Sequence, residues 1–218
     1  MQLTLALAKK IAGKTVSNPV GTWRTLWSLW RGWRFKVTCR LWRRRVVVGK
    51  NLRIYGKLVV RGPGRVTLGD NIVIGMTVTP WTYAPEALID IGSNTFLNGT
   101  RFGCKQTIRI GPYGILGDAR IMDTDFHSMS LNRHDSEAPV RVASVELGEN
   151  VWVAAQAGIL PGTIIGDNSV VGFGAVCSGS YPANVLIVGN PAKVVRTLGG
   201  RATDQTPAPM NPGGKRTA

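Results

Sequence analysis

The chain lacks features that would assign it to several common classes of protein. Among 218 residues it has only two histidines and three cysteines. Cys39, Cys104 and Cys177 form no CxxC pair and leave an odd number, which argues against a disulfide framework and indicates a reducing compartment. No run of about 18 apolar residues occurs, so no transmembrane helix is predicted. The N-terminal stretch has no basic region ahead of a short apolar segment, so no signal peptide is expected.

Acidic residues are absent from the first 69 positions. The net charge is +15, and sixteen of the 27 Lys and Arg precede Asp70, the first acidic residue. From Asp70 onward eleven basic residues face twelve acidic ones, so most of the chain is nearly neutral. The basicity therefore belongs to the N-terminal third. With 44% hydrophobic content the chain can bury the core of one domain and still carry appendages.

What the sequence does contain is a repeat of six residues. Six units follow one another without a slip in phase: LGENVW, VAAQAG, ILPGTI, IGDNSV, VGFGAV and CSGSYP. This period fits neither an α-helix nor one long strand, but it fits short strands joined by tight turns on the three sides of a coil. We expect the aliphatic first residue to point inward and the small fifth residue to fill a corner. The glycine at the second position is expected to supply turn dihedrals.

Looser copies of the repeat extend upstream to Val48 and include MDTDFH, which starts at Met122. We therefore predict an all-β fold, a parallel β-helix over 48–196, in which ANVLIVGNPAKVVR caps the last coil. Residues 1–47 are expected to form a basic, Trp-rich helical segment, and 197–218 a disordered tail. A β-sandwich with Gly-rich turns is the alternative, although it has no reason to keep a strict period of six.

The repeat breaks twice. The first break is MTVTPWTYAPEALID, and the second, longer one is the polar loop 128–146, directly after His127. A long polar excursion from a rigid solenoid is more often a functional lid than a tolerated insertion. The loop therefore marks the expected position of a site.

Three motifs together resemble one protein family: DTDFHS before the loop, the repeats from Leu147, and the closing VGNPAKVVR. They resemble the left-handed β-helix acyltransferases of the hexapeptide-repeat family, especially sugar O-acetyltransferases that act on surface polysaccharides and small saccharides. The resemblance covers roughly 48–196. It implies left-handed coils, a homotrimer and acetyl-CoA bound in the grooves between neighbouring prisms, with no metal.

The same resemblance makes His127 the general base. Imidazole, with a pKa near about 6.5, can accept the proton of a sugar hydroxyl that attacks a thioester. Asp123 or Asp125 could orient the imidazole, and we prefer Asp125 because it shares strand parity with His127. The alternative is that His127 is an ordinary surface-loop residue. His134, inside the loop, is expected to be solvated.

The resemblance also implies the remaining site residues. Asn98 in LNGTRF matches an asparagine that contacts the acceptor, and an amide can donate to a developing oxyanion. Its alternative role is that of a stacked asparagine at a β-helix turn. The residues implied to bind CoA are Ala155, Phe173 and Ser178 along the pantetheine and Lys193 and Arg196 at the phosphates.

Two positions depart from the family pattern. Relatives often carry a Thr-Lys pair where this chain has Ser178-Gly179, so one expected cation is missing. Some small-sugar relatives use an acid to hold the acceptor where this chain has Lys105. These departures weaken an assignment to those particular substrates.

Residues 23–45 combine tryptophans with arginines. Trp23, Trp27 and Trp30 recur at the spacing of one helix face. The segment fits an interfacial helix on anionic phospholipid, or a helix whose tryptophans cover the open end of the solenoid, and both can hold at once. Binding to nucleic acid is disfavoured because no recognition fold accompanies the charge.

The function expected from these residues is acetyl transfer from acetyl-CoA to a hydroxyl of a sugar or polysaccharide precursor. The expected location is the cytoplasm, peripheral at the inner face of the membrane. One alternative is an acyltransferase of the same fold acting on an amino sugar, amino acid or xenobiotic. The other is a non-catalytic, membrane-associated scaffold. A carbonic anhydrase of this fold is excluded because its zinc needs three histidines.

Overall fold

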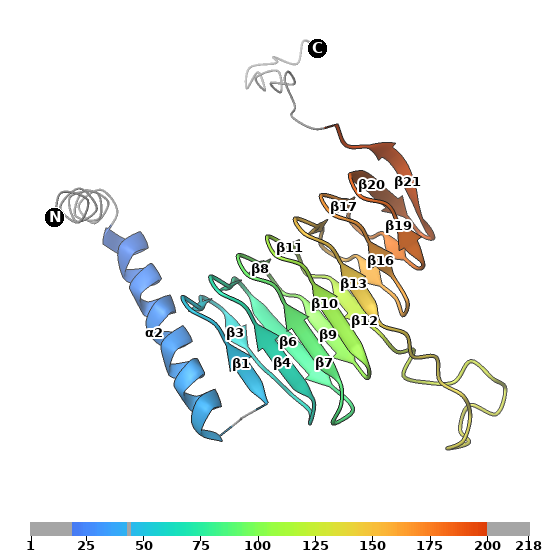
Figure 1. Ribbon diagram of the computed structural model, residues 1–218, viewed down its shortest axis with the longest axis horizontal. Coiled ribbons are helices and arrows are strands. Elements are labelled where there is room, and N and C mark those ends of the chain that lie inside the picture. Colours follow the sequence, from blue (N-terminus) through green and yellow to red (C-terminus); the bar gives the residue numbers. More distant parts are fainter. Residues whose placement is uncertain (1–18, 43–44, 200–218) are drawn as a thin grey trace, which may run out of the picture.

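The computed structural model describes residues 19–42 and 45–199 as a stack of coils with one helix at its end (Figure 1). The helix α2 (Pro19–Trp42) lies across the first coil. From there the chain advances coil by coil to the opposite end, where the last described strand lies. The coils and the loop that leaves them carry the candidate site residues.

Each full coil contributes one strand to each of three sheets. The first sheet contains β1 (Val46–Val48), β4 (Arg65–Leu68), β7 (Leu88–Ile91), β10 (Thr107–Ile110), β13 (Val145–Leu147), β16 (Ile164–Ile165) and β19 (Ser180–Tyr181). The second contains β2 (Arg53–Ile54), β5 (Val73–Ile74), β8 (Phe96–Leu97), β11 (Ile115–Leu116), β14 (Trp152–Val153), β17 (Val170–Val171), β20 (Val185–Gly189) and β21 (Ala192–Thr197). The third contains β3 (Lys57–Leu58), β6 (Thr77–Thr82), β9 (Arg101–Cys104), β12 (Arg120–Met122), β15 (Gly158–Ile159) and β18 (Val176–Cys177).

The strand pairs between successive coils are parallel, and the antiparallel β20–β21 pair closes the described chain. The predicted parallel β-helix is confirmed. The solenoid begins at Val46, two residues before the predicted start, and Thr197 is still the last residue of β21. Residues 200–218, the rest of the predicted tail, lie outside the described residues, as do 1–18 and 43–44.

The core fills the prism with one inward residue per side, as predicted. The first-position residues of the strict repeats are each at most 3% exposed, namely Leu147, Val153, Ile159, Ile165, Val171 and Cys177. The fifth-position residues are at most 1% exposed, namely Val151, Ala157, Thr163, Ser169 and Ala175. Burial of this aliphatic column is the main source of stability, because about 25 cal/mol is gained per Å² of apolar surface removed from water.

The predicted role of the second-position glycines is wrong. The left-handed residue of the strict repeats is the fourth, such as Asn150 and Asn168, with φ of 55° and 57°. Asparagine tolerates this conformation, and the two side chains also hydrogen-bond to each other over 2.9 Å. Gly166 instead has no room for a side chain, since a Cβ there would lie 2.4 Å from the backbone nitrogen of Ala183. The glycine is needed because adjacent coils touch at that corner.

The repeat frame also slips by one residue at the fourth coil. Ile121 is the buried residue that pairs with Phe102 and Ile159, whereas Met122 is half-exposed. The side that follows Leu116 thus holds five residues instead of six. MDTDFH is therefore not a hexapeptide unit in the predicted frame, and His127 lies one residue beyond the unit that it was expected to close.

Helix α2 caps the open end of the solenoid, but not with its tryptophans. Its packed face is built from small residues, including buried Ser28 and Gly32, and a Cβ on Gly32 would lie 1.8 Å from the carbonyl oxygen of Leu52. Arg31 and Lys36 donate hydrogen bonds to carbonyl oxygens of the first coil. Such carbonyls have no further coil to pair with, so the two cations satisfy them. None of the described helices is long and apolar enough to cross a membrane.

Replacing Gly166 tests the close approach of adjacent coils. We expect Gly166→Ala to lower the free energy of unfolding by about 1–3 kcal/mol, because the new methyl group overpacks the corner. The matched control is Gly158→Ala, whose Cβ would meet Val176 at an ordinary 3.8 Å. The measurement is the midpoint of unfolding in denaturant. Equal midpoints for the two variants would contradict this account of the second-position glycine.

Candidate active site

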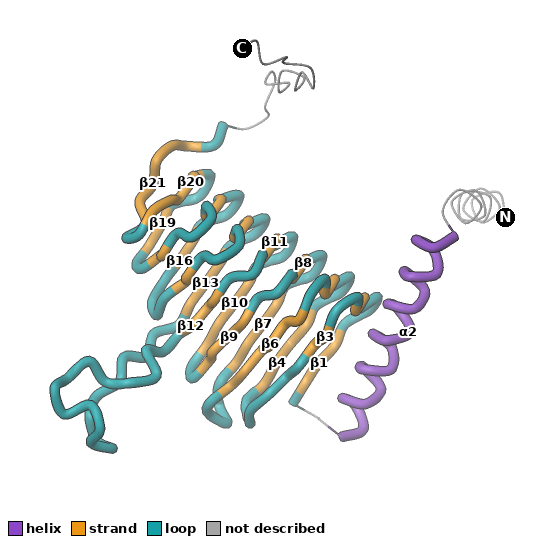
Figure 2. Tube along the Cα trace, turned by 180° about the vertical axis from the view of Figure 1, so that it is seen from behind, coloured by secondary structure: helices purple, strands orange, loops and turns teal. Residues whose placement is uncertain are grey.

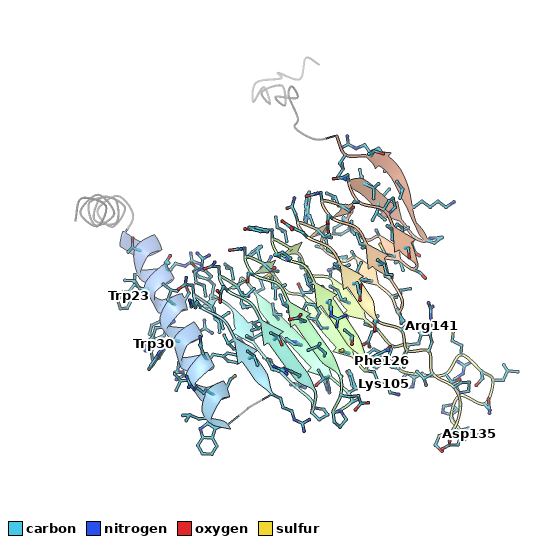
Figure 3. The ribbon with its side chains drawn as sticks, in the orientation of Figure 1. Trp23, Trp30, Lys105, Phe126, Asp135 and Arg141 are labelled. Carbon is cyan, nitrogen blue, oxygen red and sulfur yellow. The ribbon has the colours of Figure 1, made fainter. Side chains whose placement is uncertain are left out.

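Between β12 and β13 the chain leaves the prism as an extended loop (Figure 2). An isolated antiparallel bridge between Thr124 and Val142 ties the base of the loop, and the backbone N–H of Ala143 donates to the carbonyl of Asp123 over 2.9 Å. In Figure 3, Arg141 lies near this base and Asp135 lies far out in the loop. The base is therefore held firmly at the point where the candidate residues lie.

Asp123 is fully buried and both its carboxylate oxygens are occupied. They accept hydrogen bonds from the backbone N–H groups of Lys105 and Gln106, each over 2.7 Å, and from the thiol of Cys104 over 3.3 Å. Burial, together with the adjacent carboxylate, holds the pKa of the Cys104 thiol well above its usual value. Asp123 thus anchors the loop base to the corner after β9.

The residues after Asp123 form a tight turn rather than a strand. Strand β12 ends at Met122, and Phe126 has a φ of 62°. The N–H of His127 donates to the carbonyl of Asp125 over 2.7 Å, which closes a γ-turn around a left-handed central residue. In a regular strand Asp123, Asp125 and His127 would all share one face, so parity does not favour Asp125 over Asp123, and the turn removes the strand on which it was argued. A left-handed aromatic residue is strained, and such strain concentrates at functional sites.

The ring of Phe126 holds this turn on the third sheet. Gly103 makes room for it, because a Cβ at Gly103 would lie 2.5 Å from the Cζ atom of the ring. Tyr83 meets the ring edge-on, with centroids 4.9 Å apart, and itself stacks on Trp81 at 5.1 Å. Figure 3 shows Phe126 beside Lys105 at the edge of the sheet. The aromatic cluster fixes the turn, and the next residue, His127, is left exposed.

Asp125 contributes an unsatisfied acceptor two residues before the histidine. Its Oδ2 atom is buried and has no hydrogen-bond partner among the described residues. A buried acceptor without a donor costs about 1–3 kcal/mol, so a donor that arrives there is favoured. An exposed imidazole and an unpaired carboxylate oxygen thus lie in one short turn, whereas His134 is exposed in the loop.

A hollow of about 550 Å³ opens next to this turn on the outer face of the third sheet. Its lining combines aromatic and basic side chains, chiefly Trp81, Tyr83, Phe126, Arg61, Arg101 and Arg120. The repeat pattern does not predict these residues, because TPWTY interrupts the period of six. The first four residues of this stretch in fact belong to strand β6, in which outward-facing residues alternate with buried ones, and that alternation was the available signal.

Asn98 lies at the opposite end of the third-sheet strands from His127. It follows β8 and precedes β9, whereas His127 follows β12. Because β9 and β12 are parallel and in register, Asn98 lies before the N-terminal ends of these strands and His127 lies after their C-terminal ends. The Asn98 side chain lies over Gly75, and it is not one of the left-handed, stacked asparagines. One chain alone does not bring Asn98 and His127 together.

The residues implied for CoA lie on the last coils. Ala155 and Phe173 follow paired strands one coil apart at the same corner, and Phe173 is 75% exposed. Ser178 lies at the next corner, after β18, where its backbone N–H and carbonyl both meet the hydroxyl of Tyr181 at 3.3 Å. These three positions therefore do not form a single patch within one chain.

Lys193 and Arg196 are brought to one face by an irregularity in β21. Three residues apart in a regular strand, they would point to opposite faces. Lys193 pairs with Val188 and Arg196 pairs with Leu186, with a register shift between Leu186 and Ile187. This bulge absorbs one residue, so both cations lie opposite outward-facing partners. Both side chains are exposed.

No group of three or more His, Cys, Asp and Glu side chains in the described part of the chain could hold a metal ion. The candidate site consists of a strained turn with His127, a basic aromatic hollow beside this turn, and the cations Lys193 and Arg196 on β21.

Comparisons with known proteins agree with the repeat and with the fold. The family "Bacterial transferase hexapeptide (six repeats)" matches residues 144–179. WbbJ of Escherichia coli, named a lipopolysaccharide biosynthesis O-acetyl transferase, is 26% identical over 147 residues, which cover 63% of this chain and 74% of that protein. WcaF of Escherichia coli, named a colanic acid biosynthesis acetyltransferase, is 28% identical over 149 residues, 68% of each chain.

Solved structures share the fold. AntD, an N-acyltransferase from Bacillus cereus in complex with dTDP and 3-hydroxybutyryl-CoA, superposes with a TM-score of 0.62 at 20% identity, over 73% of this chain and 87% of that one. A hexapeptide-repeat acetyltransferase from Vibrio cholerae, complexed with acetyl coenzyme A, gives a TM-score of 0.51 at 17% identity, over 83% and 91%. Residues 144–179 therefore carry the repeat of this transferase family, and the β-helix is the fold of the acyltransferases that the chain resembles.

Proposed function

We propose that this chain transfers an acetyl group from acetyl-CoA to a hydroxyl of a sugar or polysaccharide precursor, with His127 as the general base. The names of WbbJ and WcaF support the acceptor class, and the Vibrio cholerae structure with acetyl coenzyme A supports the donor. The observation that carries the proposal is the strained turn that presents an exposed His127 beside a hollow.

The reaction that this arrangement suits is direct transfer. His127 accepts the proton of the acceptor hydroxyl while the oxygen attacks the thioester carbonyl. The tetrahedral intermediate then collapses, the ester forms, and the CoA thiolate leaves and takes the proton from the imidazolium. The cysteines give no support to an acyl-enzyme: all three are buried, and burial raises the pKa of Cys177 to about 11.

Asp125 is proposed to hold the imidazole during this cycle. Its buried, unpartnered Oδ2 can accept the N–H of the imidazolium that forms as His127 takes up the proton. Asp123, with both oxygens engaged by its neighbours, is less suited to that task. The preference for Asp125 therefore rests on hydrogen bonding instead of strand parity.

A homotrimer is proposed as the active assembly. Asn98 and His127 lie at opposite ends of the third-sheet strands. A trimer that brings the asparagine of one chain next to the histidine of another would therefore complete the site. The outer row of the second sheet also offers an apolar surface, because Phe96, Ile115 and Trp152 are register neighbours and 38–49% exposed. A continuous apolar row on a prism face is typical of an interface.

The acetyl-CoA groove is proposed to run along the last coils of such a trimer. Ala155, Phe173 and Ser178 would line the pantetheine, chiefly through backbone groups. Lys193 and Arg196, placed on one face by the bulge in β21, would meet the nucleotide phosphates. The phosphates carry the negative charge that these two exposed cations can neutralise.

Replacing His127 tests the general base. We expect His127→Ala to lower the turnover of acetyl-CoA with a saccharide acceptor by roughly 10² or more, because proton transfer to a positioned base contributes about that factor. The measurement is release of free CoA thiol in the presence of a panel of saccharides. His134→Ala, in the exposed part of the loop, is the control and should keep its activity. Unchanged turnover in His127→Ala would remove the residue from the mechanism.

Titration calorimetry tests the donor site without any knowledge of the acceptor. We expect acetyl-CoA to bind saturably, at one site per chain, and Lys193→Ala/Arg196→Ala to weaken binding by about tenfold or more through lost charge-assisted hydrogen bonds. The matched control is Lys50→Ala/Arg65→Ala, a pair of exposed cations on the first two coils. Absence of binding to the folded wild-type protein would favour the non-catalytic scaffold.

A peripheral contact with the inner face of the membrane is proposed for α2. The face opposite its packed side carries exposed apolar residues, 44–68% accessible, namely Trp23, Leu26, Trp27, Trp30, Trp33 and Leu41. Figure 3 shows Trp23 and Trp30 pointing away from the coils. Exposed Arg24, Arg34 and Arg40 flank them, and the helix has no acidic residue. Tryptophans at headgroup depth and arginines on anionic lipid are the features of an interfacial helix.

Vesicle sedimentation tests this contact. We expect the protein to sediment with vesicles of phosphatidylcholine and phosphatidylglycerol, and less with phosphatidylcholine alone, since each basic residue near an anionic surface contributes about 1 kcal/mol. Trp23→Ser/Trp33→Ser should release it, whereas Tyr113→Asn, an exposed aromatic residue off the helix, should not. Equal sedimentation of all three proteins would rule out this face of the helix.

A further inference from the structure

We propose that the hollow on the third sheet binds an acidic saccharide, with its aromatic side chains under the sugar ring and its arginines on a carboxylate or phosphate. This inference rests on the proposed acetyl transfer and names the acceptor class of the same site. The name of WcaF refers to colanic acid and so agrees with an anionic acceptor, but it identifies no residues that would recognise the charge.

Two arginines of the hollow, Arg101 and Arg120, lie side by side without an ion pair in the described part of the chain. Arg101 and Arg120 are register neighbours on β9 and β12, so their backbones lie about 4.8 Å apart and their side chains emerge on the same face. Like charges directly opposite each other destabilise a sheet. Neither arginine forms an ion pair among the described residues. The ion pair found there joins Arg109 and Glu146 on the first sheet.

The hollow is also basic as a whole. Arg61 is the third guanidinium of the lining and lies 5.2 Å from the centroid of the Trp81 ring. Asp118 is the one carboxylate of the lining, and its Oδ2 accepts a hydrogen bond from Gln156 over 3.0 Å. Three guanidinium groups against one engaged carboxylate leave a net positive site. Guanidinium is the group best suited to hold planar carboxylate or phosphate oxygens in two parallel hydrogen bonds.

The aromatic part of the hollow supplies the surface that a sugar ring needs. Trp81 and Tyr83 are stacked with an interplanar angle of 13°, and they are 37% and 43% exposed. Phe126 extends this aromatic cluster, with its ring edge-on to Tyr83. Concave sites of about 300–1,000 Å³ lined by aromatic side chains and a few polar groups are typical for small ligands. The volume of about 550 Å³ falls within that range.

The position of the hollow connects binding to the reaction. Phe126 lines it, and His127 is the next residue in the γ-turn. A sugar packed against the aromatic cluster, with its charged group on Arg101 and Arg120, would thus hold a hydroxyl near the imidazole. Binding energy from the charged group would serve to orient the reacting hydroxyl.

Saturation-transfer NMR with the full chain, in the absence of acetyl-CoA, tests the acceptor class. The probes are glucose, glucuronate and glucose 1-phosphate, which share one ring and differ in charge. We expect at least one anionic sugar to bind about tenfold or more tightly than glucose, and Arg101→Gln/Arg120→Gln to abolish that difference. Whichever anionic probe is preferred, glucuronate or glucose 1-phosphate, distinguishes a carboxylate from a phosphate.

Arg109→Gln is the matched control, because this arginine pairs with Glu146 on a different face of the prism. It should keep the preference for the anionic sugar. Equal binding of glucose and both anionic sugars, no saturation transfer to any of them, or an unchanged preference in Arg101→Gln/Arg120→Gln would overturn the inference. Binding of acetyl-CoA with any of these results leaves the proposed transfer standing. Sugar binding without acetyl-CoA binding would instead refute the transfer and keep the saccharide site.

Discussion

The structure depends on one constraint: each coil satisfies most of its backbone hydrogen bonds through the coils before and after it. Parallel strands at a spacing of about 4.8 Å leave little room at the corners. Glycine is therefore required where a corner touches the next coil, as at Gly166 below Ala183. The left-handed asparagines hydrogen-bond along the stack for the same reason, since equivalent corner residues lie directly above one another.

The same constraint leaves both ends of the stack with unpaired backbone groups, and the two ends are closed differently. At the first coil, α2 brings Arg31 and Lys36 to open carbonyls. Some basic residues of the N-terminal third thus hydrogen-bond to the backbone of the first coil, whereas others, such as Arg24 and Arg34, are exposed to solvent. At the last coil, β21 turns back antiparallel on β20, and its bulge aligns Lys193 with Arg196.

The sequence was sufficient for the repeating part of the molecule and insufficient where the repeat is interrupted. A fixed period of six predicted the inward residues correctly because burial selects residue type directly, as at Ile159 and Val171. The turn at Phe126 was not predictable, because its left-handed conformation is imposed by contacts with Gly103 and Tyr83, which are distant in sequence. The alternation of a regular strand therefore does not predict which way the residues around Phe126 point.

The candidate site was predicted in the same uneven way. His127 could be singled out as one of two histidines beside the long loop, and the cations of NPAKVVR from their charge. The hollow could not, because Trp81, Arg101 and Arg120 become neighbours only when successive coils are stacked in register. The missing information was the offset between coils, which changes by one residue wherever a side has five residues instead of six.

The order of the coils along the axis has an evolutionary consequence. The hollow is built on the first four coils, from β3 to β12, whereas Ala155, Phe173, Lys193 and Arg196 belong to later ones. In a solenoid each coil contacts only its neighbours, so a substitution or duplication in one coil is felt little farther along the stack. Selection could therefore diversify the coils of the proposed acceptor hollow while the coils of the proposed donor groove stay fixed, which would make the β-helix a modular scaffold for new surface chemistries.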